Sequence, residues 1–232
     1  MNPRPTSPIR ALPSRSLLAL LVAVMLCGPL VGCGRYAGLA YFFGAGRKVK
    51  IEPKYELPEG TLLIIVDDPA ERVTWPRARD LLERYLGEEL LAHEAVEQVV
   101  SPTAVARFRQ SDPRFERYAA TKLGRKLGAD TVMWIEVREF FAPTEVQDTS
   151  QAASMSVSVK VLTTQEEKRA DRVRLWPRDA GGEIVEAELN AIDAHKMGGN
   201  QAVARELARR GSILIGRLFY QHSVGDIDDE GI

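Results

Sequence analysis

Continuous apolar runs in the first half of the chain predict strands that are buried on both faces. Residues 61–66 read Thr-Leu-Leu-Ile-Ile-Val, and residues 132–135 read Val-Met-Trp-Ile. Short runs of this kind, rich in β-branched side chains and bounded by turn formers, are typical of strands inside a parallel sheet. A shorter strand is predicted at residues 96–100. Because helical patterns separate these strands, the sequence predicts two successive β-α-β units with parallel pairing.

Apolar residues at helical spacing predict the connecting helices. Residues 75–92 carry an apolar face, and Thr74 is the expected cap of that helix. Two further helices are expected over residues 101–108 and 112–127, the second with its first residue as the cap. A last helix is predicted over residues 199–221.

The second half of the chain changes to an alternation of apolar and polar residues. Residues 154–161, 172–175 and 184–189 each follow a period of two. Strands with one wet face are typical of antiparallel pairing. The whole pattern predicts an α/β fold, namely a three-layer module with a mixed sheet flanked by helices. The sheet is expected to be parallel in its first half and antiparallel in its second half.

The amino-terminal segment has the pattern of a bacterial lipoprotein signal. Three arginines and no acid come before an apolar core at residues 17–26, which is too short to span a bilayer comfortably. Leu30-Val31-Gly32-Cys33 then closes the apolar region and resembles the site at which lipoproteins are cut and acylated. We therefore expect residues 1–32 to be removed as a signal peptide and Cys33 to be lipidated. An uncleaved anchor, in which Cys33 is incidental, is the alternative.

The lipoprotein interpretation divides the rest of the chain into three parts. Residues 33–60 would be a lipidated tether, residues 61–222 a single α/β domain, and residues 223–232 an acidic disordered tail. The acyl chains of one such terminus suffice for a stable anchor in the cell envelope, facing the periplasm. Gly34 is not the aspartate that marks inner-membrane retention in enteric bacteria, which favours the outer membrane.

Charge and cysteine content narrow the possible functions. Removal of three arginines would leave 28 basic and 32 acidic residues, a net charge of −4. This balance argues against nucleic-acid binding, which needs a basic face. No cysteine follows Cys33, so the mature chain can form neither a disulfide framework nor a thiolate metal site. His93, His195 and His222 have no metal-ligand spacing and are expected to be solvated.

Two consecutive carboxylates follow the first buried strand. Asp67 and Asp68 stand at the carboxyl end of that strand, where ligands bind in open α/β sheets. Asp-Asp-Pro is also an ordinary strand exit and turn, which is the interpretation that we favour. Residues 67–74 contain no glycine, which counts against a phosphate-binding loop. We predict no catalytic residue, no cofactor, no metal site and no known small-molecule ligand.

Two further charged groups are expected to be solvated surfaces. The acidic group lies on and just before the predicted strand at residues 184–189 and consists of Glu183, Glu186 and Glu188. The basic group lies on the last helix and consists of Arg205, Arg209 and Arg210. For the basic group, contact with a partner or with lipid headgroups is the alternative.

A helix that ends in Leu127-Gly128-Ala129-Asp130 and runs into an apolar strand resembles a group of envelope lipoproteins. These are related to the curli secretion lipoprotein CsgG, to LpoB and to the amino-terminal domain of TolB, and the similarity covers about residues 61–165. The resemblance implies a three-layer α/β module that binds or assembles with other envelope proteins and catalyses nothing. The only candidate for a CsgG-type membrane hairpin is Ala152–Thr164. Its partner strand, Arg172–Trp176, is short and basic, so we do not expect a pore subunit.

Three functions follow as hypotheses. The favoured one is a lipid-anchored, non-catalytic periplasmic module that scaffolds or regulates an envelope complex. Its partners would be the membrane, through Cys33, and envelope proteins, with self-association also open. The second is a subunit of an oligomeric secretion or transport assembly in the outer membrane. The third is an envelope enzyme that uses Asp67 and Asp68, which requires a pocket at that strand end with perturbed carboxylate pKa values.

Overall fold

The computed structural model describes residues 50–143, 152–165 and 173–223. The predicted signal peptide, Cys33 and the first part of the predicted tether lie outside the described residues, as does the predicted tail after Ser223. Among the described residues, no helix has both the length and the apolarity needed to cross a membrane.

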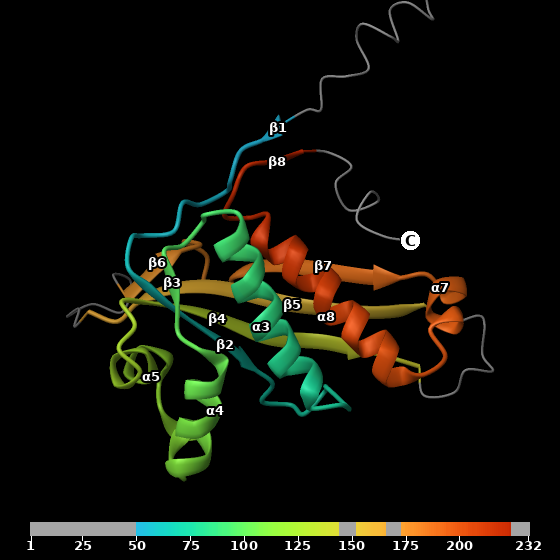
Figure 1. The fold of residues 1–232 in the computed structure, drawn as a ribbon, viewed down its shortest axis with the longest axis horizontal. Coiled ribbons are helices and arrows are strands. Elements are labelled where there is room, and N and C mark those ends of the chain that lie inside the picture. The colour runs from blue at the N-terminus through green and yellow to red at the C-terminus, as the bar shows by residue number, and fades with distance from the viewer. Residues whose placement is uncertain (1–49, 144–151, 166–172, 224–232) are drawn as a thin grey trace, which may run out of the picture. The chain divides into compact units, whose positions relative to one another are not determined.

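Parallel strands form one half of the sheet (Figure 1). β2 (Thr61–Asp67) lies between β3 (Gln98–Val99) and β4 (Thr131–Phe141), and both neighbours run parallel to it. β2 and the first part of β4 are buried on both faces, which explains why their sequences are almost continuously apolar. The predicted β-α-β units are therefore confirmed.

Antiparallel strands form the other half. β5 (Ala153–Thr163) pairs with β4 along its whole length, and its other edge pairs with β6 (Arg174–Trp176) and with β7 (Glu183–Leu189). In β7, buried residues alternate with exposed ones, as expected for a strand with one face exposed to solvent. The mixed sheet was predicted correctly. Ala152–Thr164, the hairpin candidate, contains the interior strand β5, whose inward side chains are buried.

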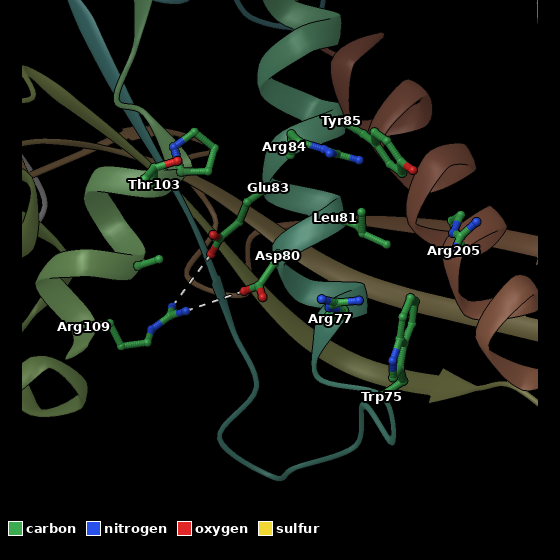
Figure 2. Close-up of a pocket in the computed structure, with 12 residues that line it drawn as sticks. Trp75, Arg77, Asp80, Leu81, Glu83, Arg84, Tyr85, Thr103, Arg109 and Arg205 are labelled. Atoms are coloured by element: carbon green, nitrogen blue, oxygen red, sulfur yellow. Dashed lines mark ion pairs between the residues drawn. The ribbon is translucent and has the colours of Figure 1, made fainter.

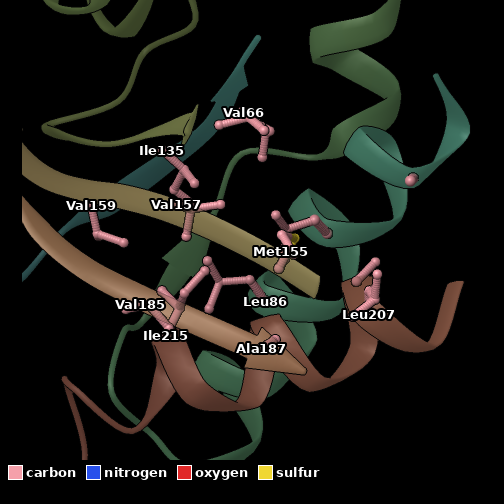
Figure 3. Packing of buried hydrophobic residues seen from close by; sticks show 14 of the residues in the cluster. Val66, Leu86, Ile135, Met155, Val157, Val159, Val185, Ala187, Leu207 and Ile215 are labelled. Atoms are coloured by element: carbon pink, nitrogen blue, oxygen red, sulfur yellow. The ribbon is translucent and has the colours of Figure 1, made fainter. Parts of the chain in front are cut away.

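Two helices, α3 (Arg77–Ala92) and α8 (Asn200–Gly216), pack against each other and cover one face of the sheet (Figure 1). Side chains at every second position of the strands meet the apolar stripes of these helices. Figure 3 shows this packing, in which Leu86 of α3 and Leu207 and Ile215 of α8 lie with strand residues. The strand residues labelled there are Val66, Ile135, Met155, Val157, Val159, Val185 and Ala187.

Three shorter elements form a second cluster with residues of the opposite face. They are α4 (Pro102–Ser111), the 3-10 helix at Phe115–Arg117 and α5 (Ala120–Lys126). Leu63 and Ile65 point to this side, because successive strand residues face opposite ways. The side chains that meet them come from all three elements and are Val105, Phe115 and Leu123. The predicted three-layer architecture is thereby confirmed.

The helix predicted over residues 112–127 is wrong, because the chain forms two short helices there. Tyr118 and Ala119 have extended backbone angles, which end the 3-10 turn before α5 begins. Asp112 does not cap a long helix. Its carboxylate instead accepts hydrogen bonds from the Arg114 N–H at 3.0 Å and the Tyr118 hydroxyl at 2.9 Å, and these bonds fix the local turn.

Other helix boundaries also differ from the prediction. α3 begins after Pro76, which occupies the cap position without a side-chain hydrogen bond, so Thr74 is not the cap. The last helix ends at Gly216, five residues early, and the chain then turns so that Phe219 and Tyr220 are buried. The short helix α7 (Ala191–Lys196) was not predicted; the Asn190 side chain accepts from the Asp193 N–H at 2.9 Å and starts it.

Part of the predicted tether packs on the domain. β1 (Lys50–Ile51) pairs with β8 (His222–Ser223), as Figure 1 shows. The backbone N–H groups of Lys54 and Tyr55 both donate to the Leu218 carbonyl, at 2.8 and 3.1 Å. The Tyr55 ring stacks on Trp176 with 5.9 Å between centroids. Residues 50–60 are therefore fixed to the domain by backbone pairing and aromatic contact.

Two helix-interior glycines provide a test of this packing. A Cβ at Gly124 would come within 2.6 Å of both Thr164 Cγ2 and Val132 Cγ2, two stiff β-branched side chains, whereas a Cβ at Gly87 would meet nothing closer than 3.4 Å. We expect Gly124→Ala to lower the free energy of unfolding by about 1–3 kcal/mol through overpacking. Gly87→Ala should raise it by about 0.5–1 kcal/mol. Urea denaturation measures the free energy of unfolding of both variants. Equal changes in the two variants would contradict the close contact between α5 and the sheet.

Candidate functional site

A cavity of about 610 Å³ lies over the outer side of α3 and is called the α3 groove below (Figure 2). It is lined by the segment before α3, one side of α3, α4 and one residue of α8. The lining residues are Trp75, Arg77, Asp80, Leu81, Glu83, Arg84, Tyr85, Pro102, Thr103, Ala106, Arg109 and Arg205.

The spacing of residues on α3 produces this groove. Leu82, Leu86 and Leu90 bury one stripe of the helix against the sheet and α8. Arg77, Leu81 and Arg84 follow at spacings of three and four on another face, so they stand together beside that stripe. Since α4 and α8 flank this face, α3 provides the floor of the groove and its neighbours provide the walls (Figure 2).

On the α4 side, a buried carboxylate connects α3 to β2. Glu83 is only 6% exposed, and its Oε1 accepts a hydrogen bond of 2.8 Å from the Val66 N–H. Burial raises the pKa of Glu83 to about 7, although the Val66 hydrogen bond and the Arg109 charge act in the opposite direction. Glu83 is thus a carboxylate that titrates near neutral pH beside the groove.

Arg109 of α4 neutralises this side of the groove. Its guanidinium lies 3.7 Å from Asp80 Oδ1, 4.0 Å from Glu83 Oε1 and 3.5 Å from Glu116 Oε1. Two of these contacts are drawn in Figure 2. The same guanidinium lies over the Phe115 ring, 4.7 Å from its centroid. With three carboxylates around one cation, this side offers no spare positive charge to a ligand.

The α8 side combines arginines with aromatic rings. Arg205 of α8 and Arg77 of α3 have no ion-pair partner in the part of the chain that the structure describes, and Trp75 and Tyr85 stand between these arginines and the core. Arg84 lies 5.0 Å over the Tyr85 ring and 3.8 Å from a Glu88 carboxylate that is itself exposed. Guanidinium groups beside aromatic faces are suited to binding carboxylates and apolar side chains together.

Asp67 and Asp68, the candidate pair from the sequence, do not line the groove. Asp68 is 6% exposed, and its two oxygens accept from the Arg72 and Val73 N–H groups, each at 2.9 Å. This geometry fits the turn interpretation. Asp67 faces Glu136 across β2 and β4. Burial first, then the charges of Glu116, Glu136 and Asp68, raise the pKa of Asp67.

The acids that do line the groove are Asp80 and Glu83, which the sequence analysis missed. The sequence did contain a signal for the burial of Glu83. Leu86 and Leu90 follow it at spacings of three and seven, so this charge falls next to the apolar stripe of the helix. A carboxylate at such a position must be buried with partners, and those partners come from β2 and α4, which periodicity along α3 does not show.

Two of the three histidines come together at the other end of α3. His93 follows the last residue of α3 and His222 lies in β8, and both line a second cavity of about 270 Å³ together with Glu89 and Tyr220. His195 lies on α7 and does not line this cavity. Among the described residues, no group of three His, Cys, Asp or Glu side chains is arranged to hold a metal ion.

The arginines of the last helix separate into two kinds. Arg205 lines the α3 groove, whereas Arg209 and Arg210 bind Glu206, with nitrogen–oxygen distances from 2.7 to 3.0 Å. Burial alone would raise the pKa of Glu206, but the hydrogen bonds and charges of Arg209 and Arg210 lower it. Arg205 is exposed, as predicted for a solvated face, whereas Arg209 and Arg210 are half-buried and ion-paired with Glu206.

The glutamates of β7 differ in their partners. The Glu183 carboxylate accepts from Lys54 Nζ at 2.5 Å, which links β7 to the segment that follows β1. Glu186 and Glu188 are exposed on β7, as the alternation predicted.

Comparison with known proteins yields remote structural similarities. No family model and no curated protein matches the sequence. The PelC dodecamer of Paraburkholderia phytofirmans is 13% identical with a TM-score of 0.38, over 75% of this chain and 98% of that chain. The hypothetical protein CT253 of Chlamydia trachomatis is 16% identical with a TM-score of 0.35, over 68% of this chain and 98% of that chain. The lipoprotein GNA1162 of Neisseria meningitidis is 17% identical with a TM-score of 0.35, over 57% of this chain and 82% of that chain. TM-scores this low carry no argument about function.

The buried carboxylate gives a pH-dependent test. The pKa of Glu83 rises on folding from 4.5 to about 7, so the unfolded chain binds fewer protons than the folded chain between these values, and stability falls as pH rises through this window. At about 1.4 kcal/mol per pKa unit, the loss is roughly 3 kcal/mol. Glu83→Gln keeps an acceptor for Val66 and should flatten this decline.

Urea denaturation of the wild type and Glu83→Gln between pH 4.5 and 7.5 provides the measurement. Glu97→Gln, an exposed change on the loop after α3, is the matched control and should keep the wild-type slope. Parallel slopes for the wild type and Glu83→Gln would show that Glu83 is ionised at the same pH in the folded and unfolded chains.

Proposed function

We propose that the chain is a lipid-anchored envelope protein whose α/β domain binds another envelope protein and scaffolds or regulates its complex, without catalysing a reaction. The observation that carries this proposal is Leu30-Val31-Gly32-Cys33 after a basic segment and a short apolar core. The resemblance of residues 123–132 to the CsgG, LpoB and TolB group supports the same class of protein. On the same basis we propose a periplasm-facing anchor, with the outer membrane favoured by Gly34.

The α3 groove supplies the surface for such a partner. Arg77 and Arg205 are cations without ion-pair partners in the described residues, and they stand beside Trp75 and Tyr85. Charge complementarity then favours a segment with acidic and apolar side chains. We propose that an acidic segment of an envelope protein binds there, its carboxylates on the arginines and its apolar side chains on the rings.

A membrane-inserted assembly is less well supported. The hairpin that it would use contains β5, which is hydrogen-bonded on both edges and buried beneath α3 and α8. Insertion of this strand into a bilayer would break the sheet at its centre and expose its core. If the protein forms oligomers, we expect its folded surface rather than β5 to make the contacts.

One observation favours a carboxylate-dependent enzyme, the raised pKa of Glu83 beside a cavity. Its Oε1, however, accepts the Val66 N–H, and Arg109 lies at 4.0 Å from the same atom. These contacts join β2, α3 and α4. We therefore propose that Glu83 holds the three elements together, with the raised pKa as a consequence of burial.

Cys33→Ala tests the anchor. In a bacterium with lipoprotein processing, the wild type should give an intact mass that matches residues 33–232 plus acyl chains, and it should fractionate with membranes. Cys33→Ala should remain unprocessed, because acylation of that thiol precedes cleavage. Cys27→Ala, the matched control, should behave as the wild type. A full-length wild-type mass without lipid would contradict the lipoprotein interpretation.

Site-specific photocrosslinking in membranes tests the groove. A crosslinking amino acid at Ala106, an exposed residue that lines the groove, should join the chain to a second protein. The neighbouring Arg107, exposed on α4 but not in the groove, is the matched control and should not. Combined Arg77→Glu and Arg205→Glu should lower the Ala106 product at least about tenfold, since like charges repel the acidic segment.

The mass of the crosslinked product separates the alternatives. A product of a different mass from two copies of the chain identifies a partner protein for sequencing. A product of twice the chain's mass would assign the groove to self-association and favour the oligomeric hypothesis. Equal yields from Ala106 and Arg107, or no effect of the two glutamates, would remove the groove from the proposal.

A further inference from the structure

The smaller cavity, of about 270 Å³, lies where the carboxyl ends of α3 and α8 meet the β1–β8 pair. Four separate parts of the chain contribute to it, with Lys50 from β1, His93 after α3, Arg217 after α8 and His222 from β8. Residues far apart in the sequence therefore place four nitrogen-bearing side chains around one space. The α3 groove involves the other end of the helix and shares no residue with this cavity.

The one carboxylate among the described residues that line this cavity is already engaged. Glu89 Oε1 accepts a hydrogen bond from the Tyr220 hydroxyl, and His93 Nε2 lies 3.4 Å from the same oxygen. The His93 ring stacks on the Tyr220 ring, with centroids 3.8 Å apart and planes at 6°. Burial, followed by the bond to Glu89, raises the pKa of Tyr220, so its hydroxyl remains a donor to Glu89 at neutral pH.

The cations that line the cavity are only partly engaged. Neither Lys50 nor Arg217 lies within ion-pair distance of a carboxylate in the described part of the chain. The Arg217 side chain hydrogen-bonds to Tyr220, but its Nε is buried without a hydrogen-bond partner. A buried guanidinium N–H without an acceptor costs free energy, and an anion in the cavity would satisfy it. His222 Nδ1 lies 3.3 Å from the Tyr220 carbonyl, so its Nε2 remains available for a second partner.

We propose that this cavity binds a phosphate group, with Arg217, Lys50 and the imidazolium form of His222 as its donors and with Glu89 held away from the anion by Tyr220 and His93. The guanidinium of Arg217 would supply the buried hydrogen bonds, and the Lys50 ammonium a mobile charge at the mouth of the cavity. The phosphate belongs either to a lipid headgroup or to a free phosphate. This inference does not rest on the proposed groove partner.

The position of the cavity gives phosphate binding a structural consequence. Lys50 and His222 are on the two strands of the β1–β8 pair, whereas Arg217 follows α8 and Glu89 belongs to α3. A phosphate held by Lys50, His222 and Arg217 would connect the two-stranded pair to the end of α8, beside Glu89 of α3. Cations at the ends of helices also offset the helix dipole without any ligand, and the experiment must separate these two roles.

Phosphorus-31 NMR of the ligand provides the test, with the whole lipidated chain in a non-ionic detergent. Inorganic phosphate is titrated at constant ionic strength, and its line width is followed in the presence of wild type, Arg217→Gln, Lys50→Gln and a control. The control is Arg107→Gln, which changes an exposed α4 arginine that does not line the cavity. We expect saturable broadening with the wild type and the control. Each of the other variants should bind phosphate roughly tenfold more weakly.

A second arm uses glycerophosphoglycerol, the deacylated headgroup of phosphatidylglycerol. Displacement of inorganic phosphate by this diester assigns the site to lipid headgroups, and failure to displace it assigns the site to free phosphate. Circular dichroism checks that each variant is folded. Because Lys50 is exposed, Lys50→Gln should fold and still test the proposal if Arg217→Gln does not fold. Absence of saturable binding, or equal binding by wild type and Lys50→Gln, would overturn the proposal. The cations would then serve only to offset the helix dipoles.

Discussion

Burial of β2 on both of its faces is the constraint on which the rest of the structure depends. Leu62, Ile64 and Val66 need an apolar cover on one side, and Leu63 and Ile65 need one on the other. A single layer of helices cannot provide both. The chain therefore places α3 and α8 against one face and α4 with α5 against the other, and β4 and β5 extend the sheet between these layers.

The same constraint creates the α3 groove. α3 and α4 follow β2 and β3 in the chain, belong to opposite layers and contact each other. Apolar side chains do not close this junction. Glu83 and Arg109 do, through the Val66 N–H and through three carboxylates around one guanidinium. Of these carboxylates only Glu83 is buried, and its raised pKa makes this corner of the structure sensitive to pH.

α3 thus carries a different polar site at each end. Near its beginning, arginines and aromatic rings face outward beside a neutralised cluster. Near its end, Glu89 and His93 meet Tyr220 and the β1–β8 pair. The helix between them is buried against the sheet and α8. The two proposals are nevertheless independent, because the sites share no residue.

The sequence by itself determined the type and order of the strands, because apolar runs and period-two alternation report local burial directly. It also determined the turn at Asp68, whose side chain bonds to the backbone four and five residues later. The helix break at Tyr118 and Ala119 was missed because apolar spacing continues through it, and only the extended backbone angles of these two residues show it. Both polar sites were decided by the tertiary structure. Glu83 with Arg109, and His93 with His222, lie 26 and 129 residues apart, and side chains so distant come together only when the layers pack, since no pattern along one helix or strand encodes its neighbour.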